Sequence, residues 1–216
     1  MSLIYIKEAG SGAKIGLWHI TEEVEELVRI KSLTEDDRQK LLSFSHEHRK
    51  KEWFSARILL EQLGREKNSE IVYDEHNKPF LKNSKKHISL SHSHDLLAVI
   101  LDDNETGIDI ELIKPNVERI KEKFMSDTEL KTLQKENLAE QLTLFWCVKE
   151  SLYKLYGKKK LTFKEDLLLE PFEYSGKGNI RAAILLGGIK RKFVLHYEKI
   201  TVDTRDYMLT YVVNEV

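Results

Sequence analysis

Three acidic residues in two separate stretches of the chain have the types and spacing that best fit a chemical role. Asp109 and Glu111 lie in the sequence Gly-Ile-Asp-Ile-Glu at residues 107–111, which is typical of a strand, and Glu150 lies in a helical pattern. Residues two apart on a strand face the same way, so we expect Asp109 and Glu111 to point together, with Glu150 reaching them from the helix. Three carboxylates repel one another unless a cation lies among them, and oxygen-only ligands favour Mg²⁺. The pattern therefore predicts a Mg²⁺ site and enzymatic phosphate chemistry.

The helix expected over residues 141–156 must carry Glu150 to the strand. Its apolar residues recur at helical spacing and predict a side that faces a core: Phe145, Val148, Leu152 and Leu155. Glu150 and Lys154 are four apart and share another face, which by itself describes an ordinary surface ion pair. With the acids of residues 107–111 as neighbours, the pair becomes part of the predicted site. The one cysteine, Cys147, lies within the apolar pattern and is expected to pack in the core.

A second polar motif, Ser-Leu-Ser-His-Ser-His-Asp, occupies residues 89–95. Its alternating hydroxyls and imidazoles predict a loop rich in hydrogen-bond donors, which suits phosphate oxygens. A Ser–His–Asp hydrolase is an alternative, although the sequence has no Gly-x-Ser-x-Gly elbow. A zinc site built on His92 and His94 lacks further ligands at the usual spacing. An isolated motif of this kind is most often a polar turn.

The two halves of the chain resemble each other in the order of their motifs. A strand-like segment that begins with glycine occurs at residues 16–20 and again at 107–111. An amphipathic helix that runs from tryptophan to glycine follows at 53–64 and again at 146–157. Segments of β character come next in both halves. We therefore expect a duplicated α+β unit, with chance similarity of two amphipathic patterns as the alternative.

The duplication predicts two subdomains, 1–103 and 104–216, separated by a polar, turn-rich cluster. At the positions that correspond to the three acids, the first half has Trp18, Ile20 and Arg57. The first half therefore cannot hold a metal in the same way, but it supplies a cation. We expect one active site between the halves, with the metal on the C-terminal side and phosphate-binding cations on the N-terminal side.

The composition is that of an ordinary globular protein. The 216 residues include 35 Lys and Arg against 36 Asp and Glu, so no overall positive charge indicates a nucleic-acid partner. No apolar run is long enough to span a membrane, and the first residues do not follow a signal-peptide pattern. These features predict a cytoplasmic protein without a membrane partner.

Five short stretches carry a resemblance to a known family. In chain order they are Lys78-Pro79, Ser91-His92-Ser93, residues 107–111, residues 124–129 and residues 146–154. Their order and spacing are similar to those of the 4′-phosphopantetheinyl transferases of the surfactin-synthetase type. Each stretch alone is weak, but together they are highly specific and span most of the chain from about Arg57 onward. The preceding part of the chain resembles the family only loosely.

The resemblance implies an α+β fold of two similar subdomains related by a pseudo-twofold axis, with coenzyme A bound in the cleft between them. It implies transfer of the 4′-phosphopantetheine arm of coenzyme A to a serine of an apo acyl or peptidyl carrier protein, with release of adenosine 3′,5′-bisphosphate. The expected metal is Mg²⁺, with Mn²⁺ as the alternative. A duplicated chain can hold the complete site as a monomer.

Carried over by position, the resemblance gives a role to each matching residue. Asp109, Glu111 and Glu150 resemble the metal ligands, and Lys154 resembles the lysine that meets the pyrophosphate. The other residues expected to contact coenzyme A are Arg57, Lys78, Pro79, Ser91, His92 and Lys149. Glu129 lies at an acidic family position near the reaction centre.

The expected mechanism needs a base for the neutral serine hydroxyl that attacks the pyrophosphate. Glu150 is the first candidate and Glu129, acting through a water, is the second. Lys154 and His92 are expected to donate hydrogen bonds to the leaving phosphate. Two other functions stay open: a Mg²⁺-dependent nuclease or phosphodiesterase, and a non-catalytic relative that binds carrier proteins. The balanced charge disfavours the first, and the intact set of acids disfavours the second.

Overall fold

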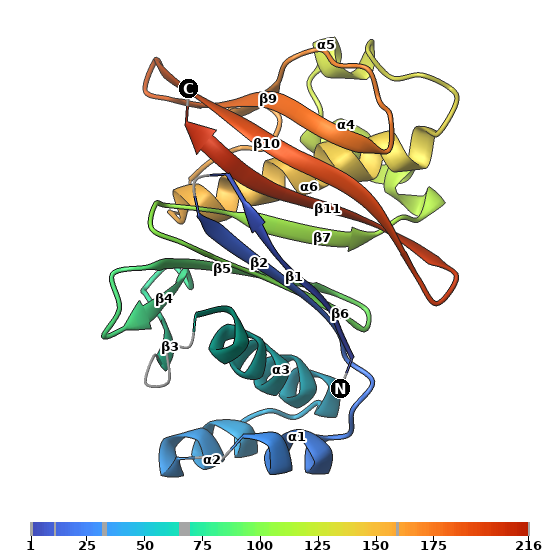
Figure 1. The fold of residues 1–216 in the computed structure, drawn as a ribbon. Coiled ribbons are helices and arrows are strands. Elements are labelled where there is room, and N and C mark those ends of the chain that lie inside the picture. Colours follow the sequence, from blue (N-terminus) through green and yellow to red (C-terminus); the bar gives the residue numbers. More distant parts are fainter. Residues whose placement is uncertain (1, 11, 32–33, 65–69, 159, 216) are drawn as a thin grey trace.

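The computed structural model describes residues 2–10, 12–31, 34–64, 70–158 and 160–215, and it confirms the expected α+β class (Figure 1). The helices are α1 (Val24–Ile30), α2 (Glu35–Leu42), α3 (Glu47–Gly64), η1 (Pro115–Ile120), α4 (Lys121–Phe124), α5 (Asp127–Leu130) and α6 (Leu138–Tyr156). The strands are β1 (Leu3–Ala9), β2 (Ala13–His19), β3 (Glu70–Tyr73), β4 (Pro79–Lys82), β5 (His87–Ser93), β6 (Leu96–Asp102), β7 (Ile108–Leu112), β8 (Leu167–Leu169), β9 (Lys177–Leu186), β10 (Ile189–Val202) and β11 (Arg205–Glu215). None of the helices in these ranges is long and apolar enough to cross a membrane.

The N-terminal half is an antiparallel sheet with α3 on one face. Its strand order is β1-β2-β6-β5. Strand β6 is an unbroken apolar run whose residues are buried on both faces, as expected of a central strand between two layers. Helix α3 buries apolar side chains, including Phe54, Leu59 and Leu63, against β2 and β6. The β3–β4 hairpin lies beside β5, and it completes this half.

The C-terminal half is a five-stranded antiparallel sheet with α6 packed along it. Its strand order is β7-β11-β10-β9-β8. The residues predicted to face a core are all buried: Phe145, Val148, Leu152 and Leu155. Cys147 is buried as well, which confirms its packing role. The helix ends before Gly157, whose φ of 68° is the left-handed conformation that glycine adopts without strain.

The two halves share one connectivity, which supports the expected duplication. In the N-terminal half, β2 leads through the short helices α1 and α2 into the long helix α3. In the C-terminal half, β7 leads through η1, α4 and α5 into the long helix α6. Each of these strands pairs with the last strand of its half, and that last strand pairs with the strand that precedes it in the chain. The resulting orders are β2-β6-β5 and β7-β11-β10. Both halves also contain a capping box, made by Thr34 with Asp37 and by Ser126 with Glu129. The pseudo-twofold axis and the boundary at residue 103 stay predictions.

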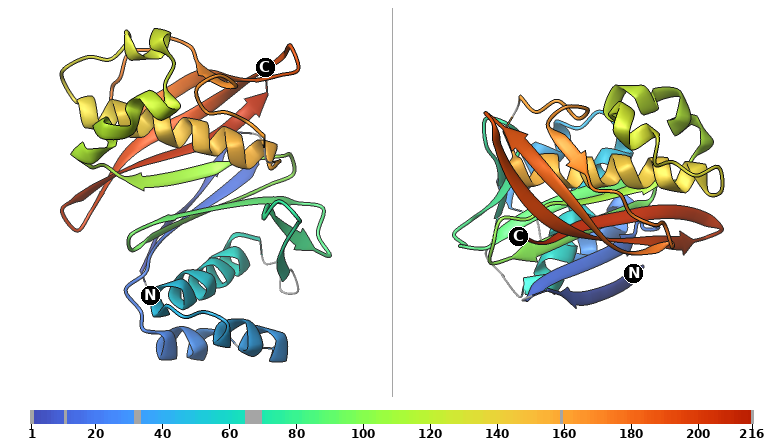
Figure 2. Two further views of the ribbon diagram at one scale, coloured as in Figure 1. Left: turned by 180° about the vertical axis from the view of Figure 1, so that it is seen from behind. Right: turned by 90° about the horizontal axis from the view of Figure 1, so that it is seen from above.

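The two sheets also share a core, so that helix α3 and helix α6 lie on outer faces (Figure 2). Alternate residues of β6 and β7 belong to this shared core: Leu96, Ala98, Ile100, Ile108 and Ile110. On β7, Asp109 lies between Ile108 and Ile110, and Glu111 follows Ile110. Both acids therefore face away from the shared core. The expectation that these two acids point the same way is therefore confirmed.

Gly107 allows α6 to come close to the start of β7. A Cβ atom at this position would lie 2.0 Å from the carbonyl oxygen of Ser151 and 3.0 Å from the amide nitrogen of Leu155. Because no side chain fits at these distances, only glycine permits the packing. The close approach brings Glu150 and Lys154 of α6 to the strand that carries the two acids.

Four strands, β1, β4, β8 and β9, are not predicted from the sequence. Strands β1 and β9 intersperse charged residues among apolar ones, whereas β4 and β8 have only four and three residues. Pairing with neighbouring strands stabilises all four, and that pairing is a tertiary feature.

Candidate functional site

The site is built where the edge strands of the two sheets meet. Strand β5 ends one sheet and β7 begins the other, and the two lie side by side (Figure 1). Side-chain hydroxyls of β5 join them. Ser91 Oγ donates to Asp109 Oδ1 at 2.7 Å, and Ser93 Oγ donates to Glu111 Oε2 at 2.9 Å. The N-terminal half therefore holds both acids of the C-terminal half by direct hydrogen bonds.

The same row of hydroxyls also accepts hydrogen bonds from the main chain of β7. The Ile108 amide donates to Ser89 Oγ at 3.2 Å, and the Leu112 amide donates to Ser93 Oγ at 3.0 Å. The prediction of a loop over residues 89–95 is wrong, because residues up to Ser93 form strand β5 and the turn comprises only the next two residues. The alternation of serines at every second position was a strand signal that the polarity of the motif concealed.

Asp109 is the most deeply buried of the three acids, at 2% exposure. Its Oδ1 atom accepts from Ser91 and from Lys154 Nζ at 2.7 Å. Its Oδ2 atom is buried and has no hydrogen-bond partner within the described ranges. Lys154 thus pairs with Asp109 rather than forming a simple surface pair with Glu150. A buried carboxylate oxygen that receives no hydrogen bond has a free electron pair, so it indicates a position where a cation can bind.

The other two acids are electrostatically linked to Asp109. Burial first, and then the charges of Asp109 and Glu111, raise the pKa of Glu150 to about 7. Burial and the charge of Asp109 also raise the pKa of Glu111. Burial is the larger cause of both pKa shifts, and repulsion between the neighbouring carboxylates adds to it. A divalent cation with a preference for oxygen would relieve that repulsion, so this donor set fits Mg²⁺ or Mn²⁺.

The three acids do not enclose a cation in the conformation described. Among the residues that the structure describes, no group of three or more His, Cys, Asp or Glu side chains has metal-binding geometry. The Lys154 ammonium occupies one side of Asp109 instead.

A cleft of about 480 Å³ opens beside the acids, between α3, the β3–β4 hairpin, β5 and the last turns of α6. Most of its charged lining is positive: Lys40, Arg49, Arg57 and Lys154. His92 also lines the cleft. Its single acidic lining residue is Glu52, and its apolar walls include Phe44, Trp53, Tyr73, Pro79 and Leu90. A cleft with several cations and apolar walls suits a ligand that carries both phosphates and a flat ring.

Arg57 is fixed in the wall of this cleft. Its guanidinium stacks on the Trp53 ring at 3.5 Å, and it donates to the carbonyl oxygens of Trp53 at 3.2 Å and Ile71 at 3.3 Å. Burial lowers the pKa of Arg57 to about 10, which leaves it charged at neutral pH. Within the described part of the chain, no carboxylate pairs with it. A rigid, half-buried guanidinium without a paired carboxylate among the described residues is well suited to bind phosphate.

His92 is held in the cleft by two residues that the sequence alone did not identify. Its Nδ1 atom lies 2.9 Å from Glu52 Oε1, and its Nε2 atom lies 2.8 Å from Arg49 NH1. The same Arg49 nitrogen donates to Glu52 Oε2 at 2.8 Å. Glu52 is nearly buried, so its carboxylate fixes both cleft side chains. Glu52 lies three residues after Arg49 on α3, a spacing at which two helical side chains can pair, and this was the available sequence signal.

Replacing Glu52 by glutamine is expected to destabilise the protein at pH 7 by on the order of 1 kcal/mol, because its partners are partly exposed. Burial alone would raise the pKa of Glu52, but the bonds and charges of His92 and Arg49 lower it overall. A depressed folded-state pKa contributes stability above the unfolded pKa, and that contribution disappears as the pH falls through the folded one. Urea unfolding of both proteins at pH 7 and at pH 3.5 measures the difference. An equal difference at both pH values would contradict the ionised contact.

Two predicted site residues lie away from the acids and pair with each other. Lys149 is fully buried, and its Nζ atom donates to Glu129 Oε2 at 2.7 Å, Phe124 O at 2.6 Å and Phe163 O at 2.9 Å. Glu129 also accepts from the Leu169 amide at 3.0 Å. The structure therefore does not bring Glu129 or Lys149 to the cleft. The Ser-x-x-Glu spacing of the capping box was the signal for this structural role.

The side chain of Lys78 does not line the cleft, although the residues on either side of it in the sequence do. Asn77 and Pro79 line the cleft, whereas Lys78 Nζ donates to the carbonyl oxygen of Leu155 at 2.7 Å. Burial lowers the pKa of Lys78. Lys78 therefore caps the C-terminal end of α6 in this structure and connects the two halves.

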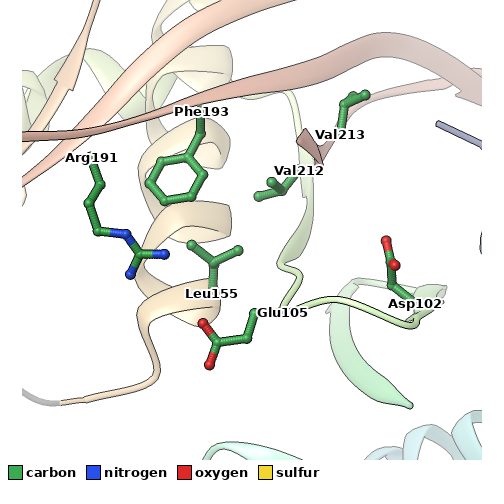
Figure 3. A pocket seen from close by; sticks show the side chains of 7 residues that line it. All are labelled: Asp102, Glu105, Leu155, Arg191, Phe193, Val212 and Val213. Carbon is green, nitrogen blue, oxygen red and sulfur yellow. The ribbon is translucent and has the colours of Figure 1, made fainter. Parts of the chain in front are cut away.

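Two further cavities lie near the site. One of about 320 Å³ opens on the Glu111 side of the acids: its lining is Ser93, His94, Glu111, Leu112, Lys114, Asn116, Val117, Ile120, Thr143 and Trp146. The other, of about 110 Å³, lies at the C-terminal end of α6, where Glu105 and Arg191 extend from its walls (Figure 3). None of the lining residues labelled in Figure 3 belongs to the predicted site. The acids thus lie between the cationic cleft and the larger of these two cavities.

Comparison with known proteins connects this site to a family. A family model described as the 4′-phosphopantetheinyl transferase superfamily matches residues 105–212, the half of the chain that carries the three acids. The 4′-phosphopantetheinyl transferase AcpT of Salmonella typhimurium is 34% identical over 116 residues, which cover 50% of this chain and 60% of that protein. The 4′-phosphopantetheinyl transferase of Bacillus subtilis is 35% identical over 88 residues, 39% of each chain.

The match to the relatives is partial in length. The 4′-phosphopantetheinyl transferase psf-1 of Bacillus pumilus is 41% identical over 75 residues, which cover 33% of this chain and 32% of that protein. The chain thus spans three fifths or less of the length of these curated relatives. The family model, however, covers half of the chain and contains Asp109, Glu111 and Glu150. The chain therefore belongs to the 4′-phosphopantetheinyl transferase superfamily.

Proposed function

We propose that this chain transfers the 4′-phosphopantetheine arm of coenzyme A to a serine of an apo acyl or peptidyl carrier protein, with release of adenosine 3′,5′-bisphosphate. The single observation that carries the proposal is the buried Oδ2 atom of Asp109, which has no hydrogen-bond partner among the described residues and lies beside a cationic cleft. Membership of the superfamily supports the same activity. The proposed enzyme acts in the cytoplasm as a monomer.

Asp109, Glu111 and Glu150 would hold Mg²⁺, or Mn²⁺ in its place. When bound, such a cation stabilises the negative charge that develops on the pyrophosphate of coenzyme A as it is cleaved. The chain's own task is to aim the carboxylates at one point. Ser91 and Ser93 would contribute by restricting the carboxylates of Asp109 and Glu111 through their hydrogen bonds.

The cations of the cleft would bind the phosphates of coenzyme A. Arg57 offers a fixed, unneutralised guanidinium, and Arg49 and His92 offer donors that Glu52 already orients. Lys154, next to Asp109, would donate to the leaving phosphate. The apolar walls would take the adenine ring.

Glu150 is the proposed base, and its carboxylate would accept the proton of the attacking serine hydroxyl. The alternative base, Glu129, is less suitable in its geometry. Its oxygens accept hydrogen bonds from the Lys149 ammonium and from the Leu169 and Ser126 amides, and it is buried away from the cleft. The proton therefore moves to the acid that lies beside Asp109.

The activity is tested by mixing the protein with coenzyme A, Mg²⁺ and a panel of apo acyl and peptidyl carrier proteins. Intact mass spectrometry should show a gain of one phosphopantetheine group on at least one carrier, and EDTA should prevent it. No gain on any carrier that a known transferase modifies would contradict the proposal. Cleavage of added DNA or RNA with Mg²⁺ would instead favour a nuclease, and carrier binding without a mass gain would favour a non-catalytic relative.

Replacing Arg57 by methionine is expected to raise the KM for coenzyme A about tenfold or more, because one charge-assisted contact is lost. The matched change Lys78→Met should raise it less, since the Lys78 ammonium bonds to the Leu155 carbonyl rather than lining the cleft. Steady-state kinetics with one carrier protein measure both values. A larger rise in KM for Lys78→Met than for Arg57→Met would indicate that the nucleotide binds near Lys78 rather than near Arg57.

A further inference from the structure

The two sheets are joined at their adjacent edges by serine side chains. Ser89, Ser91 and Ser93 project from one face of β5, and each is buried, at 3%, 6% and 7% exposure. Among the described residues, backbone pairing joins β5 only to β6, and β7 only to β11. The hydroxyls therefore supply the hydrogen bonds that cross from one half of the molecule to the other along this line.

The hydroxyl of Ser93 has a fixed direction. Its oxygen accepts a hydrogen bond from the Leu112 amide at 3.0 Å, so its own proton is free to point at Glu111 Oε2, 2.9 Å away. One atom thus connects the main chain of β7 to the carboxylate that the same strand carries. A hydroxyl held in this way restricts the orientation of the carboxylate.

Ser89 is a natural comparison for Ser93 within the same strand. Its oxygen also accepts from a β7 amide, that of Ile108 at 3.2 Å, and it is equally buried. Ser89 forms no hydrogen bond to either acid among the described residues. The two serines therefore share a structural role but differ in their contact with the acids.

We propose that Ser93 is a positioning residue that aims Glu111 at the cation, so that the N-terminal half tunes the metal affinity of the C-terminal half. The inference rests on the proposed metal site. Without the Ser93 hydroxyl, the Glu111 carboxylate loses one of its two side-chain donors and keeps only Trp146, which also lines the neighbouring cavity. Loss of such a partner typically weakens metal binding by about 10- to 100-fold.

The test compares Mn²⁺ binding to the full-length wild-type chain, Ser93→Ala and Ser89→Ala, by isothermal titration calorimetry and by the electron paramagnetic resonance signal of free Mn²⁺. Thermal unfolding in EDTA should show similar losses of stability for both variants. The Kd for Mn²⁺ should rise about tenfold or more in Ser93→Ala and stay near the wild-type value in Ser89→Ala. Ser93→Thr, which keeps the hydroxyl on a residue suited to strands, should restore the affinity.

Each other outcome has a distinct meaning. Equal Kd values for wild type and Ser93→Ala, or equal losses of affinity in both alanine variants, would overturn the positioning role while leaving the metal site intact. A wild-type chain that binds no Mn²⁺ would overturn the proposed metal site itself, and the inference with it.

Discussion

Replacing Asp109 by asparagine is expected to reduce phosphopantetheine transfer by about 10³-fold or more while the protein remains folded. The amide keeps the shape of the side chain and can still accept from Ser91 and Lys154. It removes the negative charge that would bind the cation, and a lost cation costs several kcal/mol of transition-state stabilisation. The mass-shift assay measures the loss of activity, and circular dichroism measures the fold.

The matched control is Glu198→Gln on β10. Glu198 is also a largely buried carboxylate paired with a lysine, Lys7, and it accepts from Tyr5 OH at 2.9 Å. It lies outside the cleft and the two cavities, so its replacement should change stability but leave the rate of transfer close to the wild-type value. Substantial activity in Asp109→Asn would contradict the metal site.

Replacing Glu150 by glutamine is expected to abolish transfer and yet to stabilise the metal-free protein above neutral pH. Burial and the charges of Asp109 and Glu111 raise the folded-state pKa of Glu150 to about 7, above its ordinary value of 4.5. Between these values the folded protein binds more protons than the unfolded chain, so stability falls as the pH rises. Above pH 7 the penalty is complete, and glutamine removes it, which we expect to add on the order of 2 kcal/mol.

Urea unfolding in EDTA at pH 4.5 and pH 8 measures this effect. The variant should be more stable than the wild type at pH 8 and about equally stable at pH 4.5. Addition of Mn²⁺ should stabilise the wild type more than the variant, because only the wild type has the full set of acids. A variant that is less stable than the wild type at pH 8 would contradict the close approach of the three carboxylates.

The features that the sequence predicted correctly are those that local periodicity determines. Asp109 and Glu111 are two apart in a strand, so they share a face wherever that strand lies. The apolar residues of α6, such as Val148 and Leu152, repeat at helical spacing and are buried. The order of motifs in the two halves likewise predicted a shared connectivity, which the strand orders display.

The features that the sequence did not predict depend on contacts between distant segments. Ser91 and Ser93 belong to a polar motif that resembles a turn. They are strand residues because β5 pairs with β6, and β7 then supplies acids and an amide for their hydroxyls. Glu52 is one of many charged residues on α3, and only the fold brings His92 to it. Local periodicity does not identify the partners of residues that bond across elements.

The resemblance to the family assigned some residues to the site that the structure places elsewhere. Glu129 and Lys149 lie in stretches that match the family, but their atoms form a buried ion pair that fastens surrounding segments to α6. Lys78 lies beside the cleft, yet its ammonium bonds to the end of that helix. Position along the sequence identifies the neighbourhood of a side chain, whereas its hydrogen-bond partners decide the direction in which it points.

The central claim is that acids of the C-terminal half bind a divalent cation while side chains of the N-terminal half bind the phosphates of coenzyme A. A crystal structure with coenzyme A and Mn²⁺, with the metal located by its anomalous signal, tests it most directly. We predict one metal peak bonded to Asp109, Glu111 and Glu150 and to the pyrophosphate, with the nucleotide in the cleft beside Arg57. Coenzyme A bound elsewhere, or a metal peak distant from these three carboxylates, would contradict the claim.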